Sequence, residues 1–264
     1  MANYRVLFLD IDGTILLPDH TFQDSTKEAI LQAQDKGIEV FLATGRPLHE
    51  IADLADELNI DSFIGYNGAL AIYQEKTIVN EPMQAEIILQ FGEIAKKHGH
   101  EIVFYTSKKN YFTTMDAACV ENFIQMFQMK KNDLFHAEIA DQILGATLIN
   151  LKDDEASLYE LNSSYHFSQV NVDGLRDCYD VIRDSVNKGR AVEKILERMN
   201  IQKDQAIAFG DGMNDKEMLA TVGEGFVMGN AHPDLFAYGN RKTTTVSESG
   251  IYNGLKAIDV VNKG

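Results

Sequence analysis

Short apolar runs and helix-spaced apolar residues alternate along the first third of the chain. Residues 5–10, RVLFLD, have the length and character of a strand that is buried on both faces. A helix is predicted next, because Ser25 and Glu28 have the spacing of a capping box ahead of apolar positions. A second strand is predicted over 39–43, and Pro47 suits the first turn of a second helix. Strand, helix, strand and helix in this order predict a parallel sheet.

Two further strand-like runs, at 63–66 and 69–73, follow with only Asn67 and Gly68 between them. The Asn-Gly pair accepts the positive φ angles of a two-residue turn. This segment is therefore predicted to be a β-hairpin.

The pattern changes after residue 82. A helix is predicted over 84–98, and the elements expected after it are strands over 101–107, 111–115, 146–151, 165–172 and 177–183, with helices near 117–129 and 154–162. Successive strands joined by short turns predict an antiparallel sheet with helices beside it, which is an α+β arrangement.

The alternating pattern returns after Lys188, with a helix around 192–199 and strands over 205–209 and 225–228. The sequence therefore predicts one discontinuous α/β domain made of residues 1–82 and 187–264. A second, α+β domain of residues 83–186 is predicted to be inserted in it.

Charge and composition exclude several classes of protein. The chain has 24 Lys and Arg against 40 Asp and Glu, a net charge of −16, which argues against a nucleic-acid partner. The longest uninterrupted apolar run, at 69–73, is far shorter than the about 20 residues of a membrane span. The N-terminal residues lack the pattern of a signal peptide, so a cytosolic protein is expected. Cys119 and Cys178 form no CxxC, so no disulfide or zinc framework is expected.

The first candidate for chemistry is the acidic pair Asp10 and Asp12, directly after the first predicted strand. Open α/β sheets bind ligands at the carboxyl ends of their strands, and the geometry of a strand end allows both carboxylates to face one site. The two carboxylates repel each other unless a cation neutralises them. The alternative is a solvated acidic turn. An EF-hand is excluded, because Thr21 stands where the bidentate Glu would be.

Two possible anion sites follow along the chain. Thr44 and Gly45 end the second predicted strand just before a helix, and offer a hydroxyl and an open N–H at the helix N-terminus. Lys188 opens the first helix after the insertion, where the helix dipole disfavours a cation unless an anion lies nearby. The simpler alternatives are an ordinary Thr-Gly turn and a surface lysine.

A third set of polar residues follows the strand predicted over 205–209. Asp211, Asn214 and Asp215 supply two carboxylates and an amide there, among glycines that permit a tight turn. Four such elements at strand ends or a helix start of one domain are hard to obtain by chance.

Together these segments resemble the haloacid dehalogenase-like hydrolases. The four motifs of that family correspond here to DIDGT at 10–14, TGR at 44–46, Lys188-Gly189 and GDGMND at 210–215. More narrowly, they resemble the Cof-type phosphatase branch, which has a large cap inserted between the second and third motifs (type IIB). The resemblance implies a Rossmann-like parallel-sheet core, formed by 1–82 and 187–264, and a cap of residues 83–186 that selects the substrate.

The resemblance also implies a role for each motif residue. Asp10 is the expected nucleophile, and Asp12 the general acid that protonates the leaving alcohol and then activates water. The expected Mg²⁺ ligands are Asp10, the backbone carbonyl of Asp12, and Asp211. The phosphoryl oxygens are expected to be held by Thr44, the Gly45 N–H, Lys188 and Asn214. Asp215 is expected to orient the groups around the metal.

The function predicted in this way is a Mg²⁺-dependent phosphatase of small phosphorylated metabolites, such as sugar phosphates, acting through an aspartyl phosphate. Two alternatives stay open, a phosphomutase of sugar phosphates and a non-catalytic protein that binds a phosphorylated ligand. The sequence does not select the substrate or the oligomeric state. His166, Tyr105 and Arg183 are among the cap residues that either contact substrate or support the cap.

Overall fold

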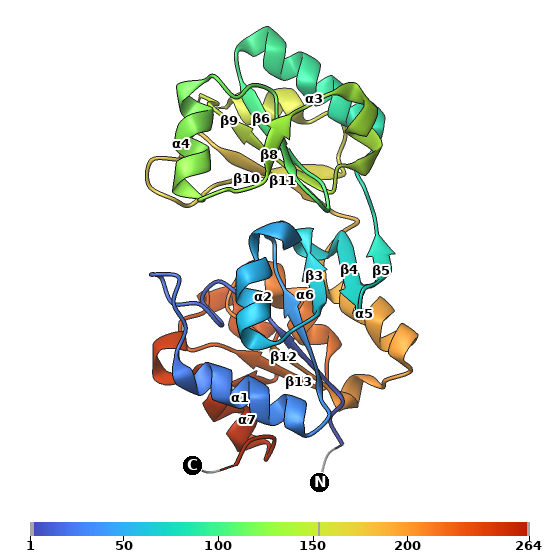
Figure 1. The fold of residues 1–264 in the computed structure, drawn as a ribbon, viewed down its shortest axis with the longest axis vertical. Coiled ribbons are helices and arrows are strands. Elements are labelled where there is room, and N and C mark those ends of the chain that lie inside the picture. Colours follow the sequence, from blue (N-terminus) through green and yellow to red (C-terminus); the bar gives the residue numbers. More distant parts are fainter. Residues whose placement is uncertain (1–2, 153, 263–264) are drawn as a thin grey trace. The chain divides into compact units, whose positions relative to one another are not determined.

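The computed structural model describes residues 3–152 and 154–262, and its backbone divides into two compact units (Figure 1). The core unit comprises Met1–Arg46, Ile51–Asn80 and Val186–Gly264, and the cap unit comprises Pro47–Glu50 and Glu81–Ser185. These borders lie within two residues of the expected domain borders, except that Pro47–Glu50 groups with the inserted segment.

The core unit contains an eight-stranded sheet. Its strands are β1 (Val6–Leu9), β2 (Glu39–Ala43), β3 (Ser62–Gly65), β4 (Leu70–Tyr73), β5 (Lys76–Asn80), β12 (Ala206–Gly210), β13 (Glu224–Val227) and β14 (Arg241–Lys242). They lie in the order β14-β13-β12-β1-β2-β3-β4-β5. Pairing is parallel from β14 to β3 and antiparallel from β3 to β5. The predicted α/β fold is confirmed, and β5 and β14 are strands that the sequence did not predict.

Helices bury both faces of this sheet. They are α1 (Asp24–Asp35), α2 (Ala52–Leu58), α5 (Lys188–Met199), α6 (Lys216–Thr221) and α7 (Gly250–Ala257). Val6 and Phe8 belong to one apolar cluster with Val192 of α5. On the other face, Gly254 of α7 lies so close to Phe209 that an added Cβ would be 2.5 Å from its ring. Covering on both faces agrees with the apolar runs of the strands.

Two local predictions for the core unit are wrong. Ser25 is not the N-cap of α1, because the helix begins at Asp24 and the Ser25 hydroxyl donates to that of Ser249. The hairpin of β3 and β4 exists, but a 3-10 turn over Tyr66–Gly68 connects it rather than a two-residue Asn-Gly turn. Gly68, with φ +107°, lies so close to the Asn187 carbonyl that a Cβ would approach it to 2.3 Å. The turn is therefore shaped by the start of α5 as well as by its own residues.

The cap unit contains a six-stranded sheet in the order β10-β11-β9-β6-β7-β8. Its elements are α3 (Ala85–His98), β6 (Glu101–Tyr105), β7 (Asn110–Phe112), α4 (Ala118–Met126), β8 (Asn132–Leu134), β9 (Gly145–Ile149), β10 (Tyr165–Gln169) and β11 (Tyr179–Arg183). All neighbours pair antiparallel except β7 and β8. Phe91 of α3 belongs to the apolar cluster of one face, and Phe123 of α4 to that of the other.

Short 3-10 helices complete the fold, at Leu48–Glu50, Tyr66–Gly68, Ala137–Gln142, Glu155–Tyr159, Lys203–Gln205, Met213–Asp215, Pro233–Ala237 and Val246–Glu248. The helix expected near 154–162 is one of these and is shorter than predicted. Among the residues described, none of the helices has the length and apolar character needed to cross a membrane.

Candidate active site

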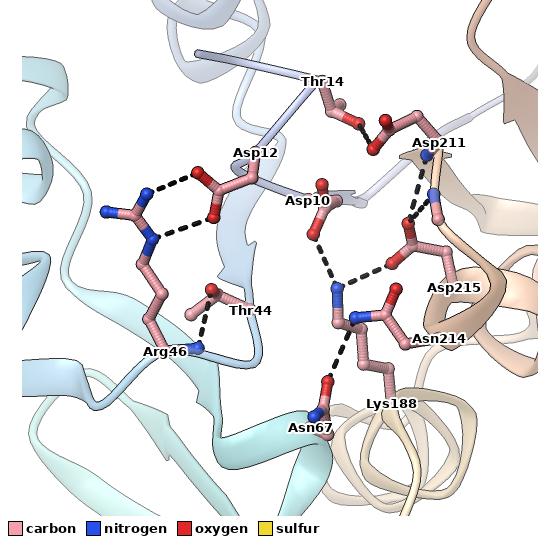
Figure 2. A network of polar contacts seen from close by, with 11 residues as sticks. Asp10, Asp12, Thr14, Thr44, Arg46, Asn67, Lys188, Asp211, Asn214 and Asp215 are labelled. Atoms are coloured by element: carbon pink, nitrogen blue, oxygen red, sulfur yellow. Dashed lines mark hydrogen bonds and ion pairs between the residues drawn. The ribbon is translucent and has the colours of Figure 1, made fainter. Parts of the chain in front are cut away.

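The polar motif residues gather at one edge of the core sheet. Strands β12, β1 and β2 are adjacent and parallel, so their carboxyl ends meet there. Asp10 follows β1, Thr44 follows β2 and Asp211 follows β12. Figure 2 shows these side chains around one small region, together with those of Asp12, Lys188, Asn214 and Asp215.

Lys188 lies at the centre of the buried part of this region. Its Nζ donates to Asp10 Oδ1 and to Asp215 Oδ1, both at 2.6 Å, and its side chain is 0% exposed. Gly189, the next residue of α5, lies against the Glu217 backbone of α6, where a Cβ would be 2.6 Å away. This close packing brings the first turn of α5 to the sheet edge. The alternative of a surface lysine is therefore wrong.

Asp215 connects the lysine to the backbone of its own loop. Its Oδ2 accepts hydrogen bonds from the Asp211 and Gly212 N–H groups, both at 3.1 Å. Because Oδ1 of Asp215 accepts from Lys188, both oxygens of this carboxylate are fixed by hydrogen bonds. The sequence expectation that Asp215 orients its neighbours is compatible with these contacts.

Two residues to which the sequence analysis assigned no role contact Asp211. Thr14 Oγ1 donates to its Oδ1 at 3.4 Å, and Asn230 Nδ2 donates to its Oδ2 at 3.4 Å and to the Gly13 carbonyl at 2.9 Å. Gly13, with φ +84°, has no room for a Cβ, which would lie 2.2 Å from the Asp211 carboxylate. Asn230 follows β13, so the rule that polar residues gather at strand ends would have found it.

Asp12 lies apart from the buried network and pairs with Arg46. The guanidinium donates from Nε to Asp12 Oδ2 at 2.8 Å and from Nη2 to Oδ1 at 2.5 Å (Figure 2). The two side chains are 51% and 35% exposed. In the sequence, Arg46 stands out only as part of the TGR motif. Its pairing with Asp12 was missed, because nothing in the sequence fixes which carboxylate an exposed arginine meets.

The remaining predicted residues lie between these two parts. The buried Thr44 hydroxyl accepts from the Arg46 N–H at 3.0 Å, which shapes the loop after β2. Asn214 Nδ2 donates to Asn67 Oδ1 at 3.1 Å. The same Asn67 oxygen would be 3.0 Å from a Cβ on Gly45. The structure thus brings together all eight predicted site residues, and adds Asn67, for which the sequence predicts only a turn.

A family model described as haloacid dehalogenase-like hydrolase matches residues 7–255 of the 264-residue chain. The chain belongs to this family. The putative phosphatase YkrA of Bacillus subtilis is 29% identical over 260 residues, covering 97% of this chain and 98% of YkrA. An HMP-PP phosphatase of Escherichia coli O6:H1 is 30% identical over 245 residues, covering 88% of this chain and 87% of that one.

A solved structure has a fold closely similar to that of this haloacid dehalogenase-like hydrolase. A hypothetical protein from Geobacillus kaustophilus HTA426 gives a TM-score of 0.90 at 28% identity, and the match covers 98% of this chain and 100% of that one. The resemblance named from the four motifs, the fold class and the phosphatase class are confirmed. The role of each site residue stays a prediction.

The carboxylates of this hydrolase site lie close enough together to perturb one another. Burial raises the pKa of Asp10 well above its usual range, the Asp215 carboxylate raises it further, and Lys188 opposes both. Burial and Asp215 likewise raise the pKa of Asp211, to about 6. Burial alone would lower the pKa of Lys188, but the Asp10 and Asp215 carboxylates outweigh burial and raise it. The site therefore carries more negative charge than its one buried cation offsets.

A metal ion fits this arrangement. Haloacid dehalogenase-like phosphatases typically use one. Asp10, Asp211 and Asp215 each offer a carboxylate oxygen, and these oxygens all lie within 4.8 Å of one another. Clustered carboxylate oxygens with unbalanced charge are suitable ligands for a hard divalent cation. Of the predicted ligands, the Asp10 and Asp211 carboxylates lie in this cluster. The third, the backbone carbonyl of Asp12, stays a prediction.

In the cap unit, the contacts of two candidate substrate residues favour a supporting role. Arg183 Nη2 donates to the Glu81 and Leu144 carbonyls, at 2.9 and 3.0 Å. The Tyr105 hydroxyl bonds to that of Thr147 at 2.9 Å.

Proposed function

We propose that the protein is a Mg²⁺-dependent phosphatase that hydrolyses small phosphorylated metabolites, such as sugar phosphates, through an aspartyl-phosphate intermediate. The observation that carries this proposal is the buried Lys188, which bonds to both Asp10 and Asp215 beside the Asp211 carboxylate. A relative named HMP-PP phosphatase adds HMP-PP to the candidate substrates. The cytosolic location expected from the sequence stays a prediction.

The reaction has two steps. In the first, an Asp10 oxygen forms a bond to phosphorus, the bond from phosphorus to the ester oxygen breaks, and Asp12 gives its proton to that oxygen. In the second, a water oxygen attacks the phosphorus while Asp12 takes up a proton from the water. The bond between Asp10 and phosphorus then breaks. The products are the alcohol and inorganic phosphate, and both aspartates return to their starting states.

The other residues hold the phosphoryl group and its charge. We assign to Lys188 the orientation of the Asp10 carboxylate, which its bond of 2.6 Å to Asp10 Oδ1 supports, and the offsetting of charge on the phosphoryl oxygens. Thr44, the Gly45 N–H and Asn214 are assigned to the remaining phosphoryl contacts. Mg²⁺, which Asp10, Asp211 and the Asp12 carbonyl would hold, would supply the positive charge that the three clustered aspartates and a phosphate dianion require.

Phosphate release from a panel of about a hundred phosphorylated metabolites, with Mg²⁺ or with a chelator, tests this function. The variant Asp10→Asn is expected to lose at least about 10⁴-fold in kcat/KM on every substrate hydrolysed. Asp35→Asn, an exposed aspartate at the end of α1, is the matched control and should retain full activity. Activity that persists in Asp10→Asn, or is indifferent to chelation, would contradict the proposal.

A further inference from the structure

The ion pair of Asp12 and Arg46 engages both oxygens of the Asp12 carboxylate. Oδ2 accepts from Nε at 2.8 Å and Oδ1 from Nη2 at 2.5 Å. In the function proposed above, Asp12 must deliver a proton to the leaving oxygen. A carboxylate paired with a guanidinium carries no proton to give. In each turnover the pair therefore has to open, and Asp12 has to take up a proton from solvent before it acts as the acid.

Among the residues described, Asp12 is the one carboxylate bonded to the Arg46 guanidinium, so opening the pair leaves this cation without an anion. Arginine presents a planar fork of donors whose geometry suits carboxylates and phosphates alike. Figure 2 shows the third guanidinium nitrogen on the side away from Asp12, and the side chain is 35% exposed. An incoming oxyanion can therefore reach the fork.

The other cation of the site has no such freedom. Lys188 is 0% exposed and donates to both Asp10 and Asp215, so it stays committed to the nucleophile. An anion on the leaving group, which lies on the Asp12 side of the transferred phosphoryl group, therefore finds Arg46 as its available partner.

We propose that Arg46 is a specificity-determining residue that exchanges the Asp12 carboxylate for an oxyanion carried by the leaving group of the substrate. The inference rests on the proposed function, because it assumes that Asp12 is the general acid. It predicts a preferred substrate class, namely phosphate esters or diphosphates whose leaving group bears a carboxylate or a phosphate near the scissile bond. Such a substrate binds Arg46 and frees Asp12 in one event, whereas a neutral leaving group opens the pair without compensation.

Two matched substrate pairs test this preference. In the first pair, 3-phosphoglycerate differs from glycerol 3-phosphate by a carboxylate on the leaving group. In the second, ADP differs from AMP by a leaving group that carries a phosphate. We expect kcat/KM to be about tenfold higher for the anionic member of at least one pair, the size of one charge-assisted hydrogen bond. If only one pair shows the preference, that pair tells whether Arg46 binds a carboxylate or a phosphate. If neither pair shows it, the proposal is overturned.

The ratio within each pair is then compared among variants. Arg46→Met should bring the preferred pair's ratio to about one, and Arg46→Lys should retain part of it, because lysine keeps the charge but not the fork. Arg198→Met, an exposed arginine near the far end of α5, is the matched control and should keep the wild-type ratio. A wild-type ratio in Arg46→Met would overturn the proposal, even if its absolute activity is lower.

Binding separates this inference from the proposed function. Titration calorimetry of the same pairs, with Mg²⁺, on Asp10→Asn and on Asp10→Asn combined with Arg46→Met requires no turnover. We expect the second variant to lose about tenfold in affinity for the anionic member and little for the neutral one. If the wild type hydrolyses nothing, the phosphatase proposal fails and this measurement still decides the role of Arg46. If adding Arg46→Met to Asp10→Asn lowers the affinity equally for the anionic and the neutral member of a pair, the proposed role of Arg46 is overturned.

Discussion

The candidate site has a buried half and an exposed half with different properties. In the buried half, Asp10, Lys188 and Asp215 are at most 8% exposed and are joined by bonds of 2.6 Å. In the exposed half, Asp12 and Arg46 are equally well paired but are 51% and 35% exposed. Removing one partner of a buried ion pair typically costs about 3–5 kcal/mol, whereas exposed pairs are typically worth at most about 1 kcal/mol. The buried half is therefore suited to contacts that stay the same through the reaction. The exposed half is suited to side chains that change their bonding partners in each catalytic cycle.

The largest effect that tests this comparison concerns Asp12. Asp12→Asn should lower kcat/KM about 10²- to 10⁴-fold on alkyl phosphates, because the leaving alkoxide then departs without a proton. With p-nitrophenyl phosphate the leaving group needs no proton, so the first turnover should stay fast while the second step slows. Rapid-mixing kinetics should then show a burst of about one equivalent of p-nitrophenolate per enzyme. Asp35→Asn is again the control, and a slow first turnover with p-nitrophenyl phosphate would argue against the acid role.

The second effect concerns the buried half. Lys188→Met should lower kcat/KM about 10²- to 10³-fold, as expected for the loss of a preorganised charge. It should also destabilise the protein by about 3–5 kcal/mol at pH 7, because buried carboxylates lose their counter-charge. The destabilisation should shrink at pH 5, since the raised pKa values of Asp10 and Asp211 allow these groups to become neutral.

Urea unfolding at the two pH values measures this change. Lys203→Met, which removes an exposed lysine bonded to Glu193 at 2.9 Å, is the matched control and should cost no more than about 1 kcal/mol. Similar losses for the two lysines would remove the distinction between the halves.

The sequence predicts which residues gather at the sheet edge but not which carboxylate Arg46 meets, and the difference has a physical reason. Asp10, Thr44 and Asp211 follow parallel strands, so the topology alone brings them together. The partner of Arg46 depends on the rotamers of a long exposed side chain, which no spacing in the sequence determines. Asn67 shows the same limit, because its turn is shaped by Asn187, which is distant in the sequence.

A third, smaller effect links pH to the metal. A carboxylate must lose its proton to bind Mg²⁺, and burial and Asp215 raise the pKa of Asp211 to about 6. About nine-tenths of this group is therefore protonated at pH 5, but only about one-tenth at pH 7. The affinity for Mg²⁺ should therefore fall at least about tenfold between pH 7 and pH 5, because the raised pKa of Asp10, the other carboxylate ligand, adds to the effect of Asp211. Titration calorimetry without substrate measures this fall. Arg46→Met should show the same fall, because it alters only the exposed half, and a pH-independent affinity would contradict the metal assignment of Asp211.

The smallest effect concerns Asn67, which lies between the two halves and contacts Asn214 at 3.1 Å. Its backbone is left-handed, with φ 54° and ψ 27°, so Asn67→Gly removes the amide without straining the turn. Asn214 is assigned to phosphoryl contacts made in the bound substrate and in the transition state alike. Without the Asn67 amide, Asn214 loses the contact that positions it. KM should then rise several-fold while kcat stays nearly constant, because about 1 kcal/mol of binding is lost equally from the bound substrate and from the transition state. Asn59→Gly has the same left-handed conformation at the end of α2 and controls for the backbone change. A fall in kcat with unchanged KM would instead place Asn67 with the buried half, among the groups that act only in the transition state.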